Sequence, residues 1–243
     1  MNPKDQALEV WGELACFSDI KTERFSYPVI TPSAARGIYD AIYCKRTEFR
    51  WQVTQIEVLK WCPDDEWTSP RYIALKRNEV TKRAPAQCTI QQWMSGAKPP
   101  KPILADDTTE HEVRVQRQTM ALRNVRYRFH AEIRPWPGFE DQLQAFEAQF
   151  RRRAARGQCI YQPYLGCREF PAYFELIDPD GPLPDHLPWN ADLGYMLYDC
   201  FDLSRPGDAH SEWRISLFKA EVTDGVLQVP DYEDARVLKP EGG

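Results

Sequence analysis

The sequence lacks a long uncharged apolar run, and its opening residues 1–5 contain no apolar segment. A membrane-spanning helix needs about 20 consecutive apolar residues, and a secretory signal needs an apolar core of roughly 7–15 residues. We therefore expect a cytoplasmic protein with no membrane partner. The chain also contains no internal repeat and no coiled coil.

The sequence contains no C-x-x-C pair, although it has seven cysteines. Structural zinc sites usually take ligands from such close pairs, so widely spaced and odd-numbered cysteines favour free thiols in a reducing compartment. The stretch Asp106–Glu112 has enough carboxylates for a divalent metal. Nothing in it defines a coordination geometry, so we expect a solvated loop and no required metal or cofactor.

Acidic residues outnumber basic ones, and the net charge of −5 argues against a nucleic-acid partner. The charge is unevenly distributed, however. From Asp178 to the end there are 5 Lys and Arg against 14 Asp and Glu, which leaves 26 against 22 for residues 1–177. This asymmetry predicts two units, of which the first is the one suited to meet a polyanion. An acidic C-terminal unit is equally a means of staying soluble.

One stretch, residues 124–134, alternates strictly between apolar and polar side chains. A strand would direct one set to the core, namely Val125, Tyr127, Phe129, Ala131 and Ile133. The other face would carry Arg126, Arg128, His130, Glu132 and Arg134. That face is either an ordinary solvated sheet surface or a polyanion-binding surface with a titratable group at its centre.

Periodicity along the first 177 residues predicts an α+β fold. The expected order is a strand at 8–17, a helix from Thr31 and Pro32 to about 44, a strand at 49–58, the strand at 124–134, a helix at 139–154 and a strand at 172–177. This is the β-α-β-β-α-β order of ferredoxin-like, RRM-like domains. A bulge is expected near Thr54. Gly37 in the first helix is unfavourable by ~1 kcal/mol relative to alanine, so we expect it to permit close packing.

Two segments fall outside this order. Prolines interrupt residues 62–120, which we interpret as an insertion with short strands, including one around Val113 and Val115. Residues 178–243 are predicted to form a small acidic β-rich domain with a strand at 195–203 and a hairpin turning at Asp224-Gly225. The predicted domains are therefore 1–177 and 178–243.

The pattern resembles the CRISPR-associated RAMP superfamily, and within it the Cas-five family, subtype d. The residues that carry the resemblance are Val10–Phe17, Pro32–Lys45, Phe49–Trp51, Arg126–Ile133 and Gln162–Pro171. The resemblance implies a ferredoxin-like domain and metal-independent cleavage of precursor CRISPR RNA beside the repeat hairpin. It also implies that the protein stays bound to the crRNA handle with other subunits of a type I-C, Cascade-type surveillance complex.

The implied chemistry is attack by a 2′-hydroxyl on the adjacent phosphate, which needs a general base, a general acid and a cation. Tyr43 and His130 match the catalytic positions of relatives, but His130 has no adjacent lysine. Arg128 or Lys45 could supply the charge, and the acid and base roles stay open, because tyrosine could merely orient the 2′-hydroxyl. The residues expected to contact RNA are Lys45, Arg46, Arg114, Arg126, Arg128, Arg134, Gly166 and Arg168.

Two other functions remain open. The chain could be a non-catalytic scaffold that only binds the handle, which the missing lysine favours. It could also be a metal-dependent nuclease acting on DNA through residues 106–112, which predicts sensitivity to a chelator.

Overall fold

The computed structural model describes residues 2–18, 24–62, 64, 66–80, 87–100, 114–178, 186–207 and 213–240, with the backbone alone at 77–80 and 114–117. The chain divides into two compact units. The first combines Met1–Ile73 with Met120–Gly243, and the second is Ala74–Thr119. Within the described parts, no helix is long and apolar enough to cross a membrane.

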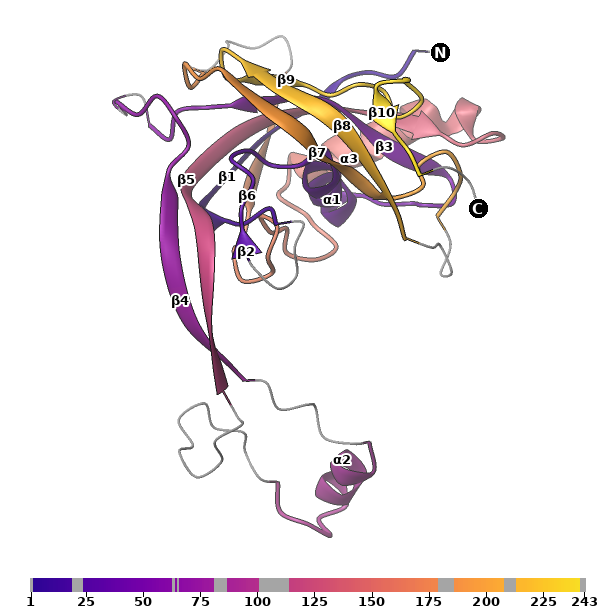
Figure 1. The fold of residues 1–243 in the computed structure, drawn as a ribbon. Coiled ribbons are helices and arrows are strands. Elements are labelled where there is room, and N and C mark those ends of the chain that lie inside the picture. Colours follow the sequence, from indigo (N-terminus) through magenta and orange to yellow (C-terminus); the bar gives the residue numbers. More distant parts are fainter. Residues whose placement is uncertain are drawn as a thin grey trace. The chain divides into compact units, whose positions relative to one another are not determined.

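The fold mixes helices with an extensive antiparallel sheet (Figure 1). The elements are β1 (Gln6–Ala15), β2 (Arg24–Phe25), α1 (Pro32–Ile42), β3 (Phe49–Val58), β4 (Tyr72–Val80), α2 (Gln87–Met94), β5 (Arg114–Pro135), a 3₁₀ turn (Glu140–Gln142), α3 (Leu143–Ala154), β6 (Tyr173–Ile177), β7 (Ala191–Phe201), β8 (Trp213–Thr223), β9 (Val226–Gln228) and β10 (Val237–Leu238). The predicted α+β composition is confirmed.

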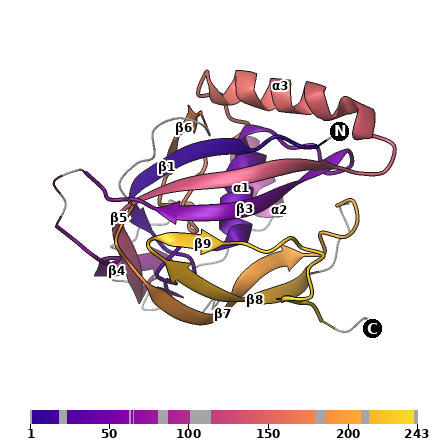
Figure 2. The ribbon, with the colours of Figure 1, turned by 90° about the horizontal axis from the view of Figure 1, so that it is seen from above.

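The sheet has the strand order β10-β8-β9-β3-β5-β1-β6. β5 is an internal strand that pairs antiparallel with β1 on one side and with β3 on the other. Figure 2 shows these three strands side by side. β7 pairs with β8, while β2 and β4 pair with β5.

The core lies on the face of the sheet that α1 and α3 cover. All five predicted core residues of β5 are buried, from 0% exposed at Phe129 to 8% at Val125. The Tyr39 hydroxyl of α1 donates to the carbonyls of Gln6 (2.7 Å) and Phe129 (2.9 Å). From α3, the Phe150 ring packs against Trp51 with centroids 4.6 Å apart. The alternation of β5 therefore correctly predicted which face is the core.

β5 is longer than expected. It runs without interruption from Arg114 to Pro135, so the prediction of a separate short strand around Val113 and Val115 is wrong. No glycine or proline lies between residues 114 and 134 to break the strand. In β3, the register shifts between Val53 and Gln55, which confirms the predicted bulge.

α1 begins as predicted, but the surroundings of Gly37 within it differ from the prediction. The Thr31 hydroxyl accepts a hydrogen bond from the Ala34 N–H at 3.2 Å, and Pro32 occupies the first turn. A Cβ built on Gly37 would meet nothing within 4 Å. The predicted close packing at Gly37 is therefore wrong, and the helix carries this glycine without a packing reason.

The C-terminal strands continue the same sheet. β9 pairs with β3 through Gln55, Ile56 and Glu57. The hairpin between β8 and β9 turns at Asp224 (φ 48°) and Gly225 (φ 76°), the two positive φ angles that a type I′ turn requires. Within the described residues, 186–240 belong to the same compact unit as β1 and α1. The predicted domain boundary at residue 178 stays a prediction.

The second unit, Ala74–Thr119, contains most of β4, the short helix α2 and the first residues of β5. None of the α2 residues is buried. The sequence did not predict α2, because its eight residues are too few to establish a repeating apolar stripe.

Candidate active site

Tyr43 is fixed at the C-terminal end of α1. It is the C-cap residue, with an extended backbone (φ −151°, ψ 118°) that turns the chain toward β3. Its carbonyl accepts a hydrogen bond from Trp51 Nε1 at 2.9 Å, and its ring packs on Phe49 with centroids 5.3 Å apart. Burial raises the pKa of the Tyr43 phenol, so near neutral pH it is a hydrogen-bond donor.

Cations surround this end of α1. Lys45 pairs with Glu48 at 2.7 Å and lies over the Phe146 ring, while its side chain stays 40% exposed. Arg153 of α3 donates from Nε to the Ile42 carbonyl at 2.6 Å, which satisfies a carbonyl that the helix leaves unpaired. Both cations act electrostatically to lower the pKa of Tyr43, against the larger effect of burial.

We call Tyr43, Lys45, Arg46 and Arg153 the α1-end cluster. Arg46 is exposed, and its carbonyl accepts a hydrogen bond from Trp136 Nε1 at 2.9 Å. A phenol donor with two cations near it, Lys45 and Arg153, can orient a ribose hydroxyl and stabilise a phosphate that gains negative charge. The cluster therefore has donors for cleavage of a phosphodiester, although it has no evident base.

His130 lies on the opposite face of the sheet from Tyr43. The Tyr43 ring contacts Phe49, which packs on Phe146 of α3 and therefore lies on the helical face. His130 stands between Phe129 and Ala131, both buried on that helical face, so its side chain points the other way. The structure does not bring the two predicted catalytic residues together.

Both nitrogens of His130 are occupied by carboxylates. Nδ1 is 2.5 Å from Asp5 Oδ2, and Nε2 is 2.8 Å from Glu57 Oε1. Glu57 also contacts His186, whose Nε2 is 3.2 Å from the other carboxylate oxygen. Burial disfavours the charged imidazole, but the hydrogen bonds to Asp5 and Glu57 outweigh it and raise the pKa of His130 to about 9. His130 is therefore an imidazolium at neutral pH and cannot accept a proton there.

The cations on the polar face of β5 are largely neutralised or covered. Arg126 pairs with Glu9 at 2.6 Å. Arg134 contacts Glu132 at 2.8 Å and Asp231 at 3.3 Å. Arg128 is only 3% exposed, which does not favour a direct phosphate contact, and among the described residues its Nε and Nη1 have no hydrogen-bond partner.

Sequence reasoning missed the carboxylates that meet these cations, namely Asp5, Glu9 and Glu57. Glu9 and Glu57 lie opposite Arg128 on the two neighbouring strands of β5. Alternation identifies the polar face of a strand but not the register of its neighbours, so the sequence contained no direct signal for these pairs.

The remaining predicted RNA contacts lie elsewhere. Gly166 has a positive φ of 82°, and a Cβ there would lie 1.9 Å from the Cys16 carbonyl oxygen. The backbone of this loop therefore requires glycine. Arg168, two residues on, is exposed and available to a ligand. The Arg114 side chain lies outside the described residues.

The described residues include no group of three or more His, Cys, Asp or Glu that could hold a metal ion. The acidic stretch Asp106–Glu112 lies outside the described residues.

Two solved structures share this fold. The crystal structure of a CRISPR-associated protein matches with a TM-score of 0.61 at 21% identity and covers 98% of each chain. That of a functionally uncharacterized protein from Streptococcus mutans matches with a TM-score of 0.57 at 19% identity and covers 97% of each chain. Both likenesses concern the fold alone.

The amino-acid sequence matches a protein family and two of its members. The family described as CRISPR-associated protein (Cas_Cas5), subtype Cas5d, matches residues 7–230. The CRISPR pre-crRNA endoribonuclease Cas5d of Mannheimia succiniciproducens is 36% identical over 93% of this chain and 94% of its own. The protein of the same name from Thermus thermophilus is 37% identical over 97% of this chain and 96% of its own. The chain therefore belongs to the Cas5d family of CRISPR-associated proteins.

Proposed function

We propose that this chain is an endoribonuclease that cleaves precursor CRISPR RNA. The observation that carries the proposal is its identity of 36% and 37% to two pre-crRNA endoribonucleases along nearly the whole length of each. Identity at this level over 93% or more of each chain favours a shared activity as well as a shared fold. The strongly acidic C-terminal segment supports RNA binding by the first 177 residues, where basic residues are in excess.

We also propose that β1, α1, β3, β5, α3 and β6 form a ferredoxin-like domain. The spatial order β6-β1-β5-β3 with antiparallel neighbours supports it, since that order places the first and third strands of the β-α-β-β-α-β unit at the centre. The helices α1 and α3 then lie together on one face of the sheet.

Cleavage is assigned to the α1-end cluster. RNA contains its own nucleophile, the 2′-hydroxyl, so the reaction can proceed without a metal-bound water. The Tyr43 phenol would donate a hydrogen bond to the reacting ribose or phosphate. The 2′-oxygen would form a bond to phosphorus and release its proton to solvent, while Lys45, Arg46 and Arg153 stabilise the dianionic phosphorane. The bond from phosphorus to the 5′-oxygen would then break, which leaves a 2′,3′-cyclic phosphate and a 5′-hydroxyl that takes its proton from solvent.

A catalytic role for His130 stays a prediction, and its contacts favour a structural one. Both of its nitrogens face carboxylates, so a proton could reach RNA only after one of these pairs opened. The alternative function is a subunit that holds the crRNA handle and docks neighbouring subunits without cutting RNA, and it applies if the wild type binds RNA and does not cleave it.

The test is cleavage of a labelled repeat-hairpin RNA in EDTA by the wild type, Tyr43→Phe and His130→Gln, with binding measured in parallel. Tyr43→Phe removes one hydroxyl and keeps the ring packing, so cleavage should fall by about 10²- to 10⁴-fold while binding persists. We expect His130→Gln to cleave within about tenfold of the wild type when both are folded.

Three results would decide against parts of this proposal. A wild type that binds RNA without cutting it would establish the scaffold function. Cleavage abolished by EDTA would contradict metal independence. An RNA with 2′-deoxyribose at the scissile position serves as the matched control, and its cleavage would exclude attack by the 2′-hydroxyl.

A further inference from the structure

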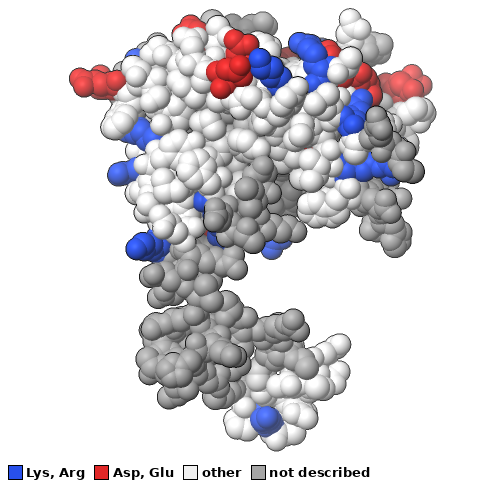
Figure 3. Space-filling view, in the orientation of Figure 1, with Lys and Arg blue, Asp and Glu red and all other residues white. Residues whose placement is uncertain are grey.

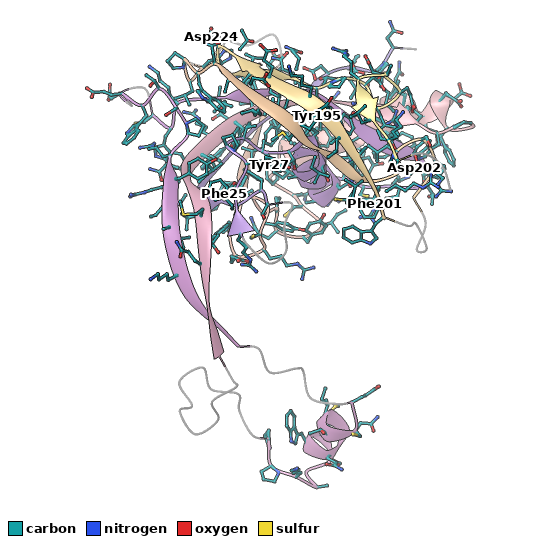
Figure 4. The ribbon with its side chains drawn as sticks, in the orientation of Figure 1. Phe25, Tyr27, Tyr195, Phe201, Asp202 and Asp224 are labelled. Atoms are coloured by element: carbon teal, nitrogen blue, oxygen red, sulfur yellow. The ribbon has the colours of Figure 1, made fainter. Side chains whose placement is uncertain are left out.

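A cavity of about 570 Å³ lies beside α1 in the first compact unit. It opens between α1, the end of β1, the 161–167 loop and β7, and residues from each of these line it. Its size falls in the range of about 300–1,000 Å³ typical of small-ligand sites. Figure 4 shows Tyr195 and Phe201 on β7, the strand that contributes Leu197 and Cys200 to the cavity lining, and Phe25 in β2.

Gly37 forms part of the α1 side of this cavity. A Cβ at this position would meet nothing within 4 Å, so neither packing nor backbone geometry accounts for glycine in the interior of the helix. Glycine is a poor helix former, and almost any other residue would stabilise α1 more. A glycine at position 37 is explained if a ligand occupies the space that a side chain would otherwise fill.

The opposite wall is aromatic. Tyr161 and Tyr164 line the cavity, and Tyr161 is 46% exposed, so one side of its ring is open to a ligand. Phe17 contributes a third ring from the end of β1. Aromatic walls with one exposed face are how proteins hold unpaired bases, since every base has a π-face that can stack.

Charge favours a base over a phosphate in this cavity. Among its described lining residues only Arg24 carries a charge at neutral pH, and Arg24 pairs with Glu169 at 2.6 Å. Figure 3 shows mostly uncharged side chains over β7 on this face, with Lys and Arg nearer its margins. An uncharged aromatic heterocycle fits such surroundings without an unpaired charge.

The cavity and the proposed cleavage site both adjoin α1, the cavity beside Gly37 and the site at the C-terminal end of the helix. The Ile160 N–H donates to the Ala41 carbonyl at 2.6 Å, which holds the tyrosine-bearing loop along α1. Gly37 and Tyr43 are six residues apart on α1, or about 9 Å along the helix axis. A nucleotide in the cavity would therefore be close in the chain to the phosphate at the α1-end cluster.

We propose that this cavity holds one unpaired base of the repeat RNA, stacked against Tyr161 and Tyr164 beside Gly37. The inference rests on the proposed function and adds to it a determinant of the cleavage position. A base held here would fix the position of the RNA strand on the protein. The phosphate presented to Tyr43 would then always lie the same number of nucleotides from the bound base.

The test uses 2-aminopurine, a fluorescent base whose emission is quenched by stacking, placed singly at each unpaired position beside the repeat hairpin. In the wild-type complex, one position should differ from all others in its emission. Gly37→Leu projects a side chain into the space beside Gly37 and should abolish that signal by displacing the stacked base, whereas Gly37→Ala leaves room and should retain it. Tyr161→Ala should weaken binding by about 5- to 100-fold and shift or blur the cleavage position.

Thermal unfolding serves as the control for correct folding of the variants. Gly37→Leu should unfold at no lower a temperature than the wild type, because leucine is a better helix former than glycine. If Gly37→Leu does not fold, Tyr161→Ala decides by the same fluorescence readout. A scan with no distinct position, or a signal that survives Gly37→Leu, would overturn the inference while wild-type cleavage continues. Loss of RNA cleavage by the wild type itself would instead overturn the proposed function.

Discussion

At the scale of the single residue, Gly166 shows how backbone geometry can restrict a position to one type of amino acid. Its φ of 82° is in the left-handed region, and its Cα faces the Cys16 carbonyl oxygen at a distance that excludes any Cβ. The adjacent Leu165 carbonyl accepts a hydrogen bond from the Cys16 N–H at 3.0 Å, so the loop is held directly against the end of β1. Glycine here preserves the wall of the cavity, whether or not it also contacts RNA.

We predict that Gly166→Ala destabilises the protein by ~3 kcal/mol or more, since it combines an unfavourable φ with a backbone clash. Gly138→Ala is the matched control. Gly138 has a φ of 92°, but a Cβ there would meet nothing within 4 Å, so only a loss of ~1 kcal/mol is expected. Urea unfolding of both variants measures the difference, and equal losses would show that the contact with Cys16 is unimportant.

At the scale of the elements, the His130 contacts connect parts of the chain that are distant in sequence. Asp5 precedes β1, Glu57 is in β3, His130 is in β5 and His186 precedes β7. Hydrogen bonds to His130 and His186 lower the pKa of Glu57 in spite of its burial. The cluster therefore tightens the sheet on the face that the helices do not cover.

Stability should depend on the charge of His130. Its pKa is raised from 6.5 to about 9 in the folded protein, so its contribution is fully present below about pH 6.5 and is lost as the pH rises through about 9. The loss should be on the order of 3 kcal/mol. Unfolding free energies measured at pH 6.5 and pH 9.5 should show it for the wild type and not for His130→Gln. If the unfolding free energy of the wild type does not fall between these two pH values, Asp5 and Glu57 do not stabilise the charged form of His130.

At the scale of the whole molecule, charge separates a basic first part from an acidic last part. Lys45 and Lys219 allow this separation to be tested with matched residues. Each lysine is exposed and paired with a carboxylate, Lys45 with Glu48 at 2.7 Å and Lys219 with Asp192 at 3.2 Å. They differ in that Lys45 is in the α1-end cluster and Lys219 is in the acidic segment.

We predict that Lys45→Ala lowers RNA affinity and reduces the slope of log affinity against log salt by ~0.7–0.9, because one phosphate contact and its released counterion are lost. Lys219→Ala should leave the slope unchanged. Titrations at several salt concentrations measure both variants. An equal effect of the two substitutions would show that RNA does not distinguish the two parts of the chain.

The local features of this protein followed from its sequence. The alternation of β5 identified its core face, Thr31 and Pro32 marked the start of α1, and Asp224-Gly225 marked a turn with two positive φ angles. Each depends only on neighbouring residues, whose steric and hydrogen-bonding preferences act within a few positions. The family resemblance was equally readable, because it rests on short contiguous segments.

Only the tertiary structure decided how distant segments meet. It placed Tyr43 and His130 on opposite faces of the sheet, paired His130 with Asp5 and Glu57, and buried Arg128. It also left Gly37 facing open space where close packing was expected. A periodic pattern specifies which face a side chain occupies, but what covers that face depends on strand register and on segments more than 70 residues away, which no local preference determines.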